Sequence, residues 1–135
     1  MLNLILLAII STTYAIHGPL ILENIGSNCG ENDVFQVETF EVMPWPPILG
    51  AKSYIYMHGM FHQNIWLQEI SVGTCVNSDT CTWQRFDINT RFYAEESWPF
   101  EILWIYPSEP GNYFTNVHLT AGNHVSCWQF TYELN

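Results

Sequence analysis

The sequence predicts an all-β fold, an antiparallel β-sandwich of about seven strands. Between residues 34 and 133 the dominant hydrophobic period is two, the period of a strand, and no helical period is sustained. The apolar runs are short and bounded by Gly, Pro, Asn and Ser. Aromatic residues make up 16% of the chain and charged residues only 12%, so much bulky apolar surface has to be buried between layers.

The strands follow one another at short intervals. We expect them at Val34–Met43, Ser53–Met60, Ile65–Val72, Trp83–Thr90, Pro99–Tyr106, Tyr113–Thr120 and His124–Glu133. The cluster Pro44 to Pro47 ends the first strand, because proline donates no hydrogen bond to a ladder. The turn residues of 120–123 predict a hairpin between the last two strands. No linker, internal repeat or low-complexity tract interrupts this pattern.

Alternation along the strands assigns one set of apolar side chains to the interior. This inward set is Phe40, Val42, Ile55, Met57, Ile70, Val72, Phe86, Ile88, Phe100, Ile102, Val117, Leu119, Trp128 and Phe130. Composition does not distinguish a filled core from two sheets parted around a ligand, and by itself it favours the filled core.

The N-terminus is interpreted as a secretory signal peptide over residues 1–15, followed by a single domain over residues 16–135. Leu2 to Ile10 is nearly all apolar, and Ala15 supplies a small residue for cleavage. The alternative is a buried N-terminal strand. No later stretch has the roughly 20 apolar residues of a membrane-spanning helix, so the mature protein is expected to be soluble.

Secretion, as the expected signal peptide implies, determines how the four cysteines are interpreted. An even number in a small secreted chain indicates disulfides, whereas the same number in the cytosol would suggest metal or redox chemistry. Four cysteines allow three connectivities, and the residues alone do not choose among them. Zinc sites need closely spaced pairs such as C-x-x-C, which the chain lacks.

The net charge of −10 limits the possible partners. Lys52, Arg85 and Arg91 are the only basic residues, so nucleic acid is excluded as a partner. Repulsion from anionic membranes weakens when carboxylates are protonated and histidines become charged in an acidic compartment. The charge therefore predicts either a pH-dependent, transient membrane contact or simply high solubility.

The chain shows no catalytic motif, and we expect neither an enzyme nor a bound cofactor or metal. His58 and His62 would lie roughly 13 Å apart on a strand, too far to share a metal ion. His118 and His124 flank the predicted hairpin turn and are expected to approach each other, with no acidic ligand adjacent. No G-x-S-x-G sequence is present.

The order of the cysteines and turn residues is more specific than any single motif. In sequence they are Asn28-Cys29-Gly30, Pro44-Trp45-Pro46-Pro47, Cys75, Cys81, Pro110-Gly111-Asn112-Tyr113 and Ser126-Cys127-Trp128. This order resembles that of the ML lipid-recognition family, the group of the Niemann-Pick type C sterol carrier and of phosphatidylglycerol/phosphatidylinositol transfer proteins. The matching residues extend over nearly the whole predicted domain.

The resemblance implies an Ig-like sandwich whose two sheets part and hold one lipid, a phospholipid or a sterol, between them. The inward set would then line the lipid cavity. It also implies two disulfides, Cys29 with Cys127 and Cys75 with Cys81. The expected location is extracellular or in the lumen of an endosome or lysosome.

The sequence therefore favours a monomeric carrier that binds and transfers one lipid. One alternative is a co-receptor that presents lipid to a protein acceptor or receptor. Another is an Ig-like interaction module with a closed core. Because indoles favour membrane interfaces, Trp45, Trp98 and Trp104 are candidates for a rim that touches the membrane.

Overall fold

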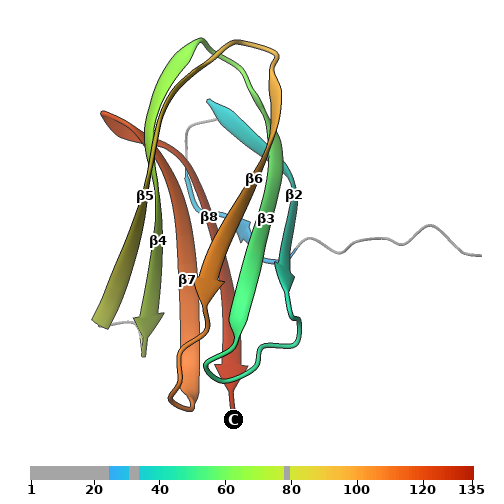
Figure 1. Cartoon of the computed structure of the whole chain (residues 1–135), viewed down its shortest axis with the longest axis vertical. Helices are drawn as coiled ribbons and strands as arrows, with labels where there is room; N and C mark the ends of the chain where they lie inside the picture. Colours follow the sequence, from blue (N-terminus) through green and yellow to red (C-terminus); the bar gives the residue numbers. More distant parts are fainter. Residues whose placement is uncertain (1–24, 31–33, 78–79) are drawn as a thin grey trace, which may run out of the picture.

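Two antiparallel sheets pack face to face in the computed structural model, which describes residues 25–30, 34–77 and 80–135 (Figure 1). Its strands are β1 (Ser27–Asn28), β2 (Phe35–Met43), β3 (Lys52–Phe61), β4 (Ile65–Val76), β5 (Thr80–Phe92), β6 (Ser97–Ile105), β7 (Gly111–Ala121) and β8 (Asn123–Leu134). The five-stranded sheet has the order β1-β8-β7-β4-β5, and the three-stranded sheet the order β2-β3-β6. The predicted all-β sandwich is confirmed, with eight strands in the described part of the chain. The expected signal peptide lies outside the described residues.

The additional strand is β1, which pairs with Gln129 and Trp128 of β8. The other seven coincide with the expected ones except at their ends. The largest difference is in the β4–β5 hairpin, where the strands were expected to stop at Val72 and to restart at Trp83. In the structure the ladder continues through Cys75, which pairs directly with Cys81 and forms a disulfide with it. Apart from Gly73 and Val76 this extension consists of threonine and cysteine, so hydrophobic alternation does not reveal it.

An aromatic core fills the space between the sheets. Phe61 stacks on Phe92 with ring centroids 4.4 Å apart, and Phe35 lies 4.7 Å from Phe61. Most of the inward set is buried in this core: Phe40, Val42, Ile55, Met57, Ile70, Val72, Phe100, Ile102, Val117, Leu119, Trp128 and Phe130. Phe86 and Ile88 are only half-buried, because β5 is the outermost strand of the wider sheet.

Several large core residues were not in the inward set. They are Phe35, Phe61, Leu67, Phe92, Trp104, Tyr106, Tyr113, Val125, Tyr132 and Leu134. The tyrosines are buried with their hydroxyls paired: Tyr106 donates to the Pro44 carbonyl oxygen at 2.8 Å, and Tyr113 donates to that of Glu109 at 2.8 Å. Burial of a phenol is tolerated when its hydroxyl has a partner.

Glycine is required where strands or rings approach the backbone closely. A Cβ atom added to Gly73 of β4 would lie 2.6 Å from the indole of Trp83, which lies across it from β5. At Gly59 of β3 a Cβ atom would overlap the backbone of Gln36 in β2. Both positions therefore exclude larger residues.

Candidate ligand-binding groove

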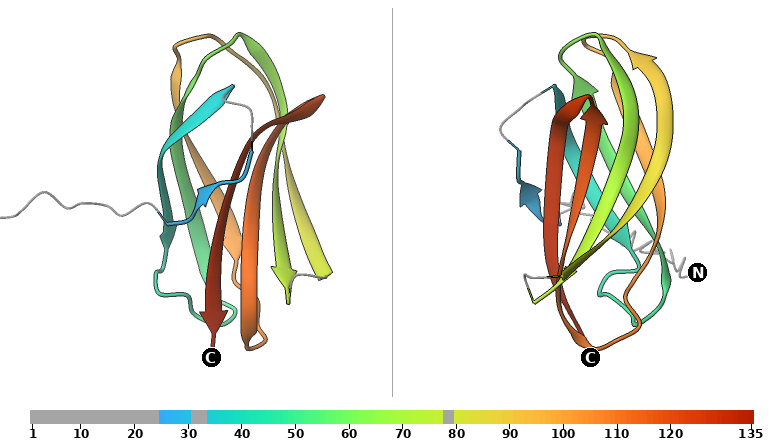
Figure 2. Two further views of the ribbon diagram at one scale, coloured as in Figure 1. Left: turned by 180° about the vertical axis from the view of Figure 1, so that it is seen from behind. Right: turned by 90° about the vertical axis from the view of Figure 1, so that its left-hand side faces the viewer.

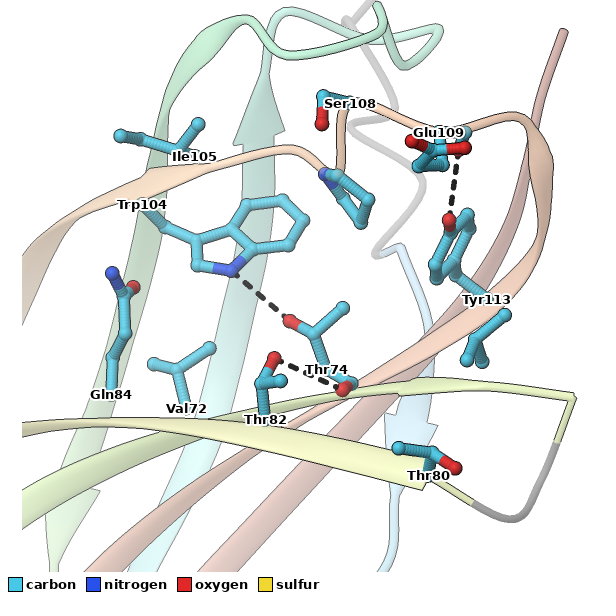
Figure 3. A pocket seen from close by; sticks show the side chains of 12 residues that line it. Val72, Thr74, Thr80, Thr82, Gln84, Trp104, Ile105, Ser108, Glu109 and Tyr113 are labelled. Carbon is cyan, nitrogen blue, oxygen red and sulfur yellow. Dashed lines mark hydrogen bonds between the residues drawn. The ribbon is translucent and has the colours of Figure 1, made fainter.

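A groove of about 480 Å³ opens where the two sheets diverge, between the β4–β5 hairpin and the end of β6. β5 and β6 are joined at the top of Figure 1 and separate toward the lower end. The lining residues Thr80, at the start of β5, and Ile105, at the end of β6, belong to that end. Figure 3 shows side chains from both sheets converging on it. Its lining residues are Val72, Thr74, Val76, Thr80, Thr82, Gln84, Trp104, Ile105, Pro107, Ser108, Glu109 and Tyr113.

The indole of Trp104 forms part of the groove wall and links the two sheets. Its Nε1 donates a hydrogen bond to Thr74 Oγ1 at 3.2 Å, from β6 to β4 (Figure 3). Thr74 Oγ1 lies 3.5 Å from Thr115 Oγ1, which lies 3.0 Å from the Tyr132 hydroxyl. This chain of polar groups holds the indole in one orientation. If the ring turned away, its N–H group would lose the hydrogen bond to Thr74 and would be left without a partner among apolar side chains.

Tyr132 is a neutral phenol at physiological pH. Burial raises the pKa of Tyr132 to about 12, although its hydrogen bond with Thr115 acts in the opposite direction. The hydroxyl can therefore take part in the polar chain beneath the groove at any physiological pH without introducing a charge into the core.

The groove combines apolar walls with a polar rim that carries a single carboxylate. Val72, Val76 and Pro107 give an apolar surface beside the indole, whereas threonines, a serine and Gln84 contribute hydroxyl and amide groups. Glu109 is the one ionisable carboxylate in the lining, and the lining contains no Lys or Arg. Such a site suits a mainly apolar molecule that carries hydroxyl or ammonium groups at one end.

The predicted cavity residues are not brought together around this groove. Of the inward set only Val72 lines it, whereas the other buried members pack against one another in the aromatic core. The threonines and Gln84 of the lining were missed because they interrupt the apolar pattern. Their positions nevertheless continue the alternation of β5, since Thr82 and Gln84 share the face of Phe86. Polar residues at inward positions were therefore an available signal.

The predicted membrane rim of three tryptophans is wrong. Trp104 is only 2% exposed. Trp45 and Trp98 are exposed, but Trp45 follows the end of β2 and Trp98 lies at the start of β6, at opposite ends of the sandwich (Figure 2). Within the described residues there is no helix of the length and hydrophobicity needed to cross a membrane.

The two histidines beside the last turn do approach each other, on the outer face of the five-stranded sheet. The ring centroids of His118 and His124 are 4.5 Å apart, and Trp83 lies 5.7 Å from His118. His118 Nε2 is 3.9 Å from Cys127 Sγ. In the described part of the chain, no three residues among His, Cys, Asp and Glu gather closely enough to hold a metal ion.

Acidification is expected to destabilise the protein through His118. Burial, and then the neighbouring His124, hold the pKa of His118 below its usual 6.5. At pH values between the two pKa values, His118 is protonated in the unfolded chain and neutral in the folded protein. Stability is therefore lost as pH falls from 6.5 toward the lower pKa of the folded protein.

This expectation is tested by thermal unfolding between pH 8 and pH 5 for the wild-type protein and for His118→Gln. The wild type should lose more stability than the variant on acidification, because all other titrating groups are shared. Parallel pH profiles would contradict the assignment.

The comparisons with known proteins show the fold alone. No family model matches the chain, and no curated protein matches its sequence. The C-terminal domain of wzt superposes with a TM-score of 0.68 at 8% identity, over 82% of this chain and 78% of that one. A Niemann-Pick type C2 protein from Japanese carpenter ant superposes with a TM-score of 0.58 at 7% identity, over 82% of this chain and 99% of that one. The resemblance to the ML family thus holds for the β-sandwich.

Proposed function

We propose that this protein binds a single lipid in the groove between β5 and β6 and carries it as a non-catalytic transfer protein. The observation that carries the proposal is the 480 Å³ groove itself, with apolar walls from both sheets and a polar rim of hydroxyl groups and one carboxylate. The fold shared with a Niemann-Pick type C2 protein supports it. So do the two disulfides, which suit a secreted or endolysosomal protein.

The groove is expected to hold the apolar part of the lipid against Trp104, Val72 and Val76. Each buried CH₂ group contributes about 0.8 kcal/mol, so part of an acyl chain or a sterol ring system suffices for binding. Beyond Gln84, the inward face of β5 continues with Phe86 and Ile88, which are half-buried and packed against the core. These two residues would contact the lipid as it extends along the strand.

The rim selects the polar end of the lipid. Thr80, Thr82 and Ser108 offer hydroxyl groups, and Glu109 offers a carboxylate, with no basic residue in the lining. A sterol hydroxyl or the ammonium of a zwitterionic phospholipid would find a partner there. An anionic headgroup would find no basic partner in the rim and would be repelled by the carboxylate of Glu109. The proposed ligands are therefore sterols and zwitterionic phospholipids.

The proposal is tested by native mass spectrometry of the secreted protein after incubation with phosphatidylcholine vesicles that contain sterol, followed by extraction of the bound lipid. One lipid per chain is expected. A bare protein mass would instead favour the interaction module with a closed core. Transfer between vesicles by the isolated protein would distinguish a carrier from a co-receptor that only presents the lipid.

Filling the groove is expected to abolish lipid binding without unfolding the protein. Thr82 is exposed on β5 and lines the groove, so Thr82→Trp adds an indole into the space. The bound fraction should fall at least tenfold, measured by the same mass spectrometry. Arg85→Trp adds the same side chain to the outer face of β5 and should bind lipid normally. Equal binding by both variants would exclude the groove as the site.

A further inference from the structure

Part of the outer, solvent-facing side of the three-stranded sheet carries large apolar side chains. Met43 of β2 is 64% exposed, Tyr54 of β3 is 50% exposed, and Leu103 and Ile105 of β6 are 49% and 51% exposed. Polar residues normally occupy the solvent side of a sandwich sheet. Neighbouring exposed apolar residues on one face indicate a binding surface, because covering them with a partner removes apolar surface from water and lowers the free energy.

The register places three of these residues in one row across the sheet, whereas the fourth, Ile105, pairs with Lys52 and lines the groove between β5 and β6. Met43 pairs with Tyr54, and Tyr54 pairs with Leu103, which gives an apolar row. In the next row Tyr56 lies between two carboxylates, since Glu41 and Glu101 are its partners on either side. The strands of this sheet, β2, β3 and β6, lie side by side in Figure 1.

A groove of about 370 Å³ follows these two rows. It is lined by Glu41, Met43, Tyr54, Tyr56 and Glu101. None of these residues lines the groove between β5 and β6, so the two sites are separate.

We propose that this face docks a protein partner through a basic segment, in which an arginine is flanked by apolar side chains. The guanidinium would stack on the ring of Tyr56, and the apolar neighbours would cover the row of Met43, Tyr54 and Leu103. The two glutamates stand on strands either side of Tyr56, about 10 Å apart from the spacing of neighbouring strands. A planar guanidinium over the ring can donate hydrogen bonds toward both of them.

The charge of the protein favours a basic segment over a second copy of the chain or a membrane as the occupant of this face. The chain has a net charge of −10 and only three Lys and Arg residues, so a cationic partner is attracted and a second copy of the chain is repelled. A membrane would cover the apolar row, but it would also have to desolvate Glu41 and Glu101 against lipid, which is costly for unpaired carboxylates. A basic segment instead neutralises them. The inference does not depend on lipid binding in the other groove.

The test uses a nine-residue synthetic peptide in which arginine alternates with leucine, and the wild-type protein. Saturable binding is expected at 50 mM NaCl and should weaken at higher salt. Glu41→Gln combined with Glu101→Gln should raise Kd at least tenfold. Tyr56→Leu keeps the apolar surface but removes the aromatic face, and should raise Kd several-fold.

Controls separate this site from general attraction to an acidic protein. Asp87→Asn combined with Glu133→Gln removes the same charge from exposed positions on the five-stranded sheet, and Kd should stay within twofold. An equal loss in both double variants would overturn the proposal. So would sedimentation showing a dimer that Met43→Ser dissociates, or binding to phosphatidylcholine vesicles that Tyr56→Leu abolishes while peptide affinity is unchanged.

Discussion

Replacing Cys29 and Cys127 together by serine is expected to lower the free energy of unfolding by about 2 to 5 kcal/mol. This disulfide joins residues separated by 98 positions, so its loss releases nearly the whole sandwich from one covalent constraint in the unfolded state. It also fastens β1 to β8, where Cys29 N donates to the Cys127 carbonyl oxygen at 3.0 Å. Chemical denaturation of the variant measures the effect directly.

The second disulfide supplies the matched control. Cys75 and Cys81 are separated by only 6 positions in a hairpin, so the chain-entropy model assigns their bond about 2 kcal/mol, against about 5 kcal/mol for the long one. The Cys75→Ser and Cys81→Ser double variant should therefore unfold at a higher denaturant concentration than the first. Equal midpoints would contradict the loop-length explanation.

The fold could be predicted because the interior is encoded by local alternation. Val42, Ile55 and Ile102 were assigned to the same face from sequence, and the register places them in one row across the three-stranded sheet. The strand pairing itself could not be derived in this way. The resemblance to the ML family implied the same two cysteine pairs that the structure contains. The residues alone left all three disulfide connectivities open.

The groove could not be predicted because it arises where the edge strands β5 and β6 of the two sheets diverge, and no residue pattern encodes that divergence. Alternation treats every inward position alike, so it assigned Phe86 and Phe40 to the same interior. In the structure Phe40 is completely buried, whereas Phe86 lies on an edge strand that the narrower sheet leaves partly open. Trp104 was assigned to a rim from the chemistry of indole, yet it shares the inward parity of Phe100 and Ile102. The alternation of β6 therefore predicts the burial of Trp104 correctly, whereas the chemistry of indole did not.

Replacing Ile102 by Asp is expected to prevent folding. Ile102 is 4% exposed and lies opposite Ile55, which is completely buried. The substitution removes an apolar side chain from a packed core and leaves a carboxylate there without a partner, which costs more than the usual 0.5 to 3 kcal/mol of a point mutation. Little folded protein should be recovered, and no cooperative thermal transition should remain.

Ile102→Val provides the comparison, because it removes one methylene group and should cost only about 0.5 to 1.5 kcal/mol. The pair of variants also decides where a lipid lies. If the sheets parted around a ligand at the centre of the sandwich, Ile102→Asp would fold but would bind no lipid. Loss of folding, together with normal lipid binding by Ile102→Val and none by Thr82→Trp, would place the ligand at the edge between β5 and β6, outside a core that aromatic rings already fill.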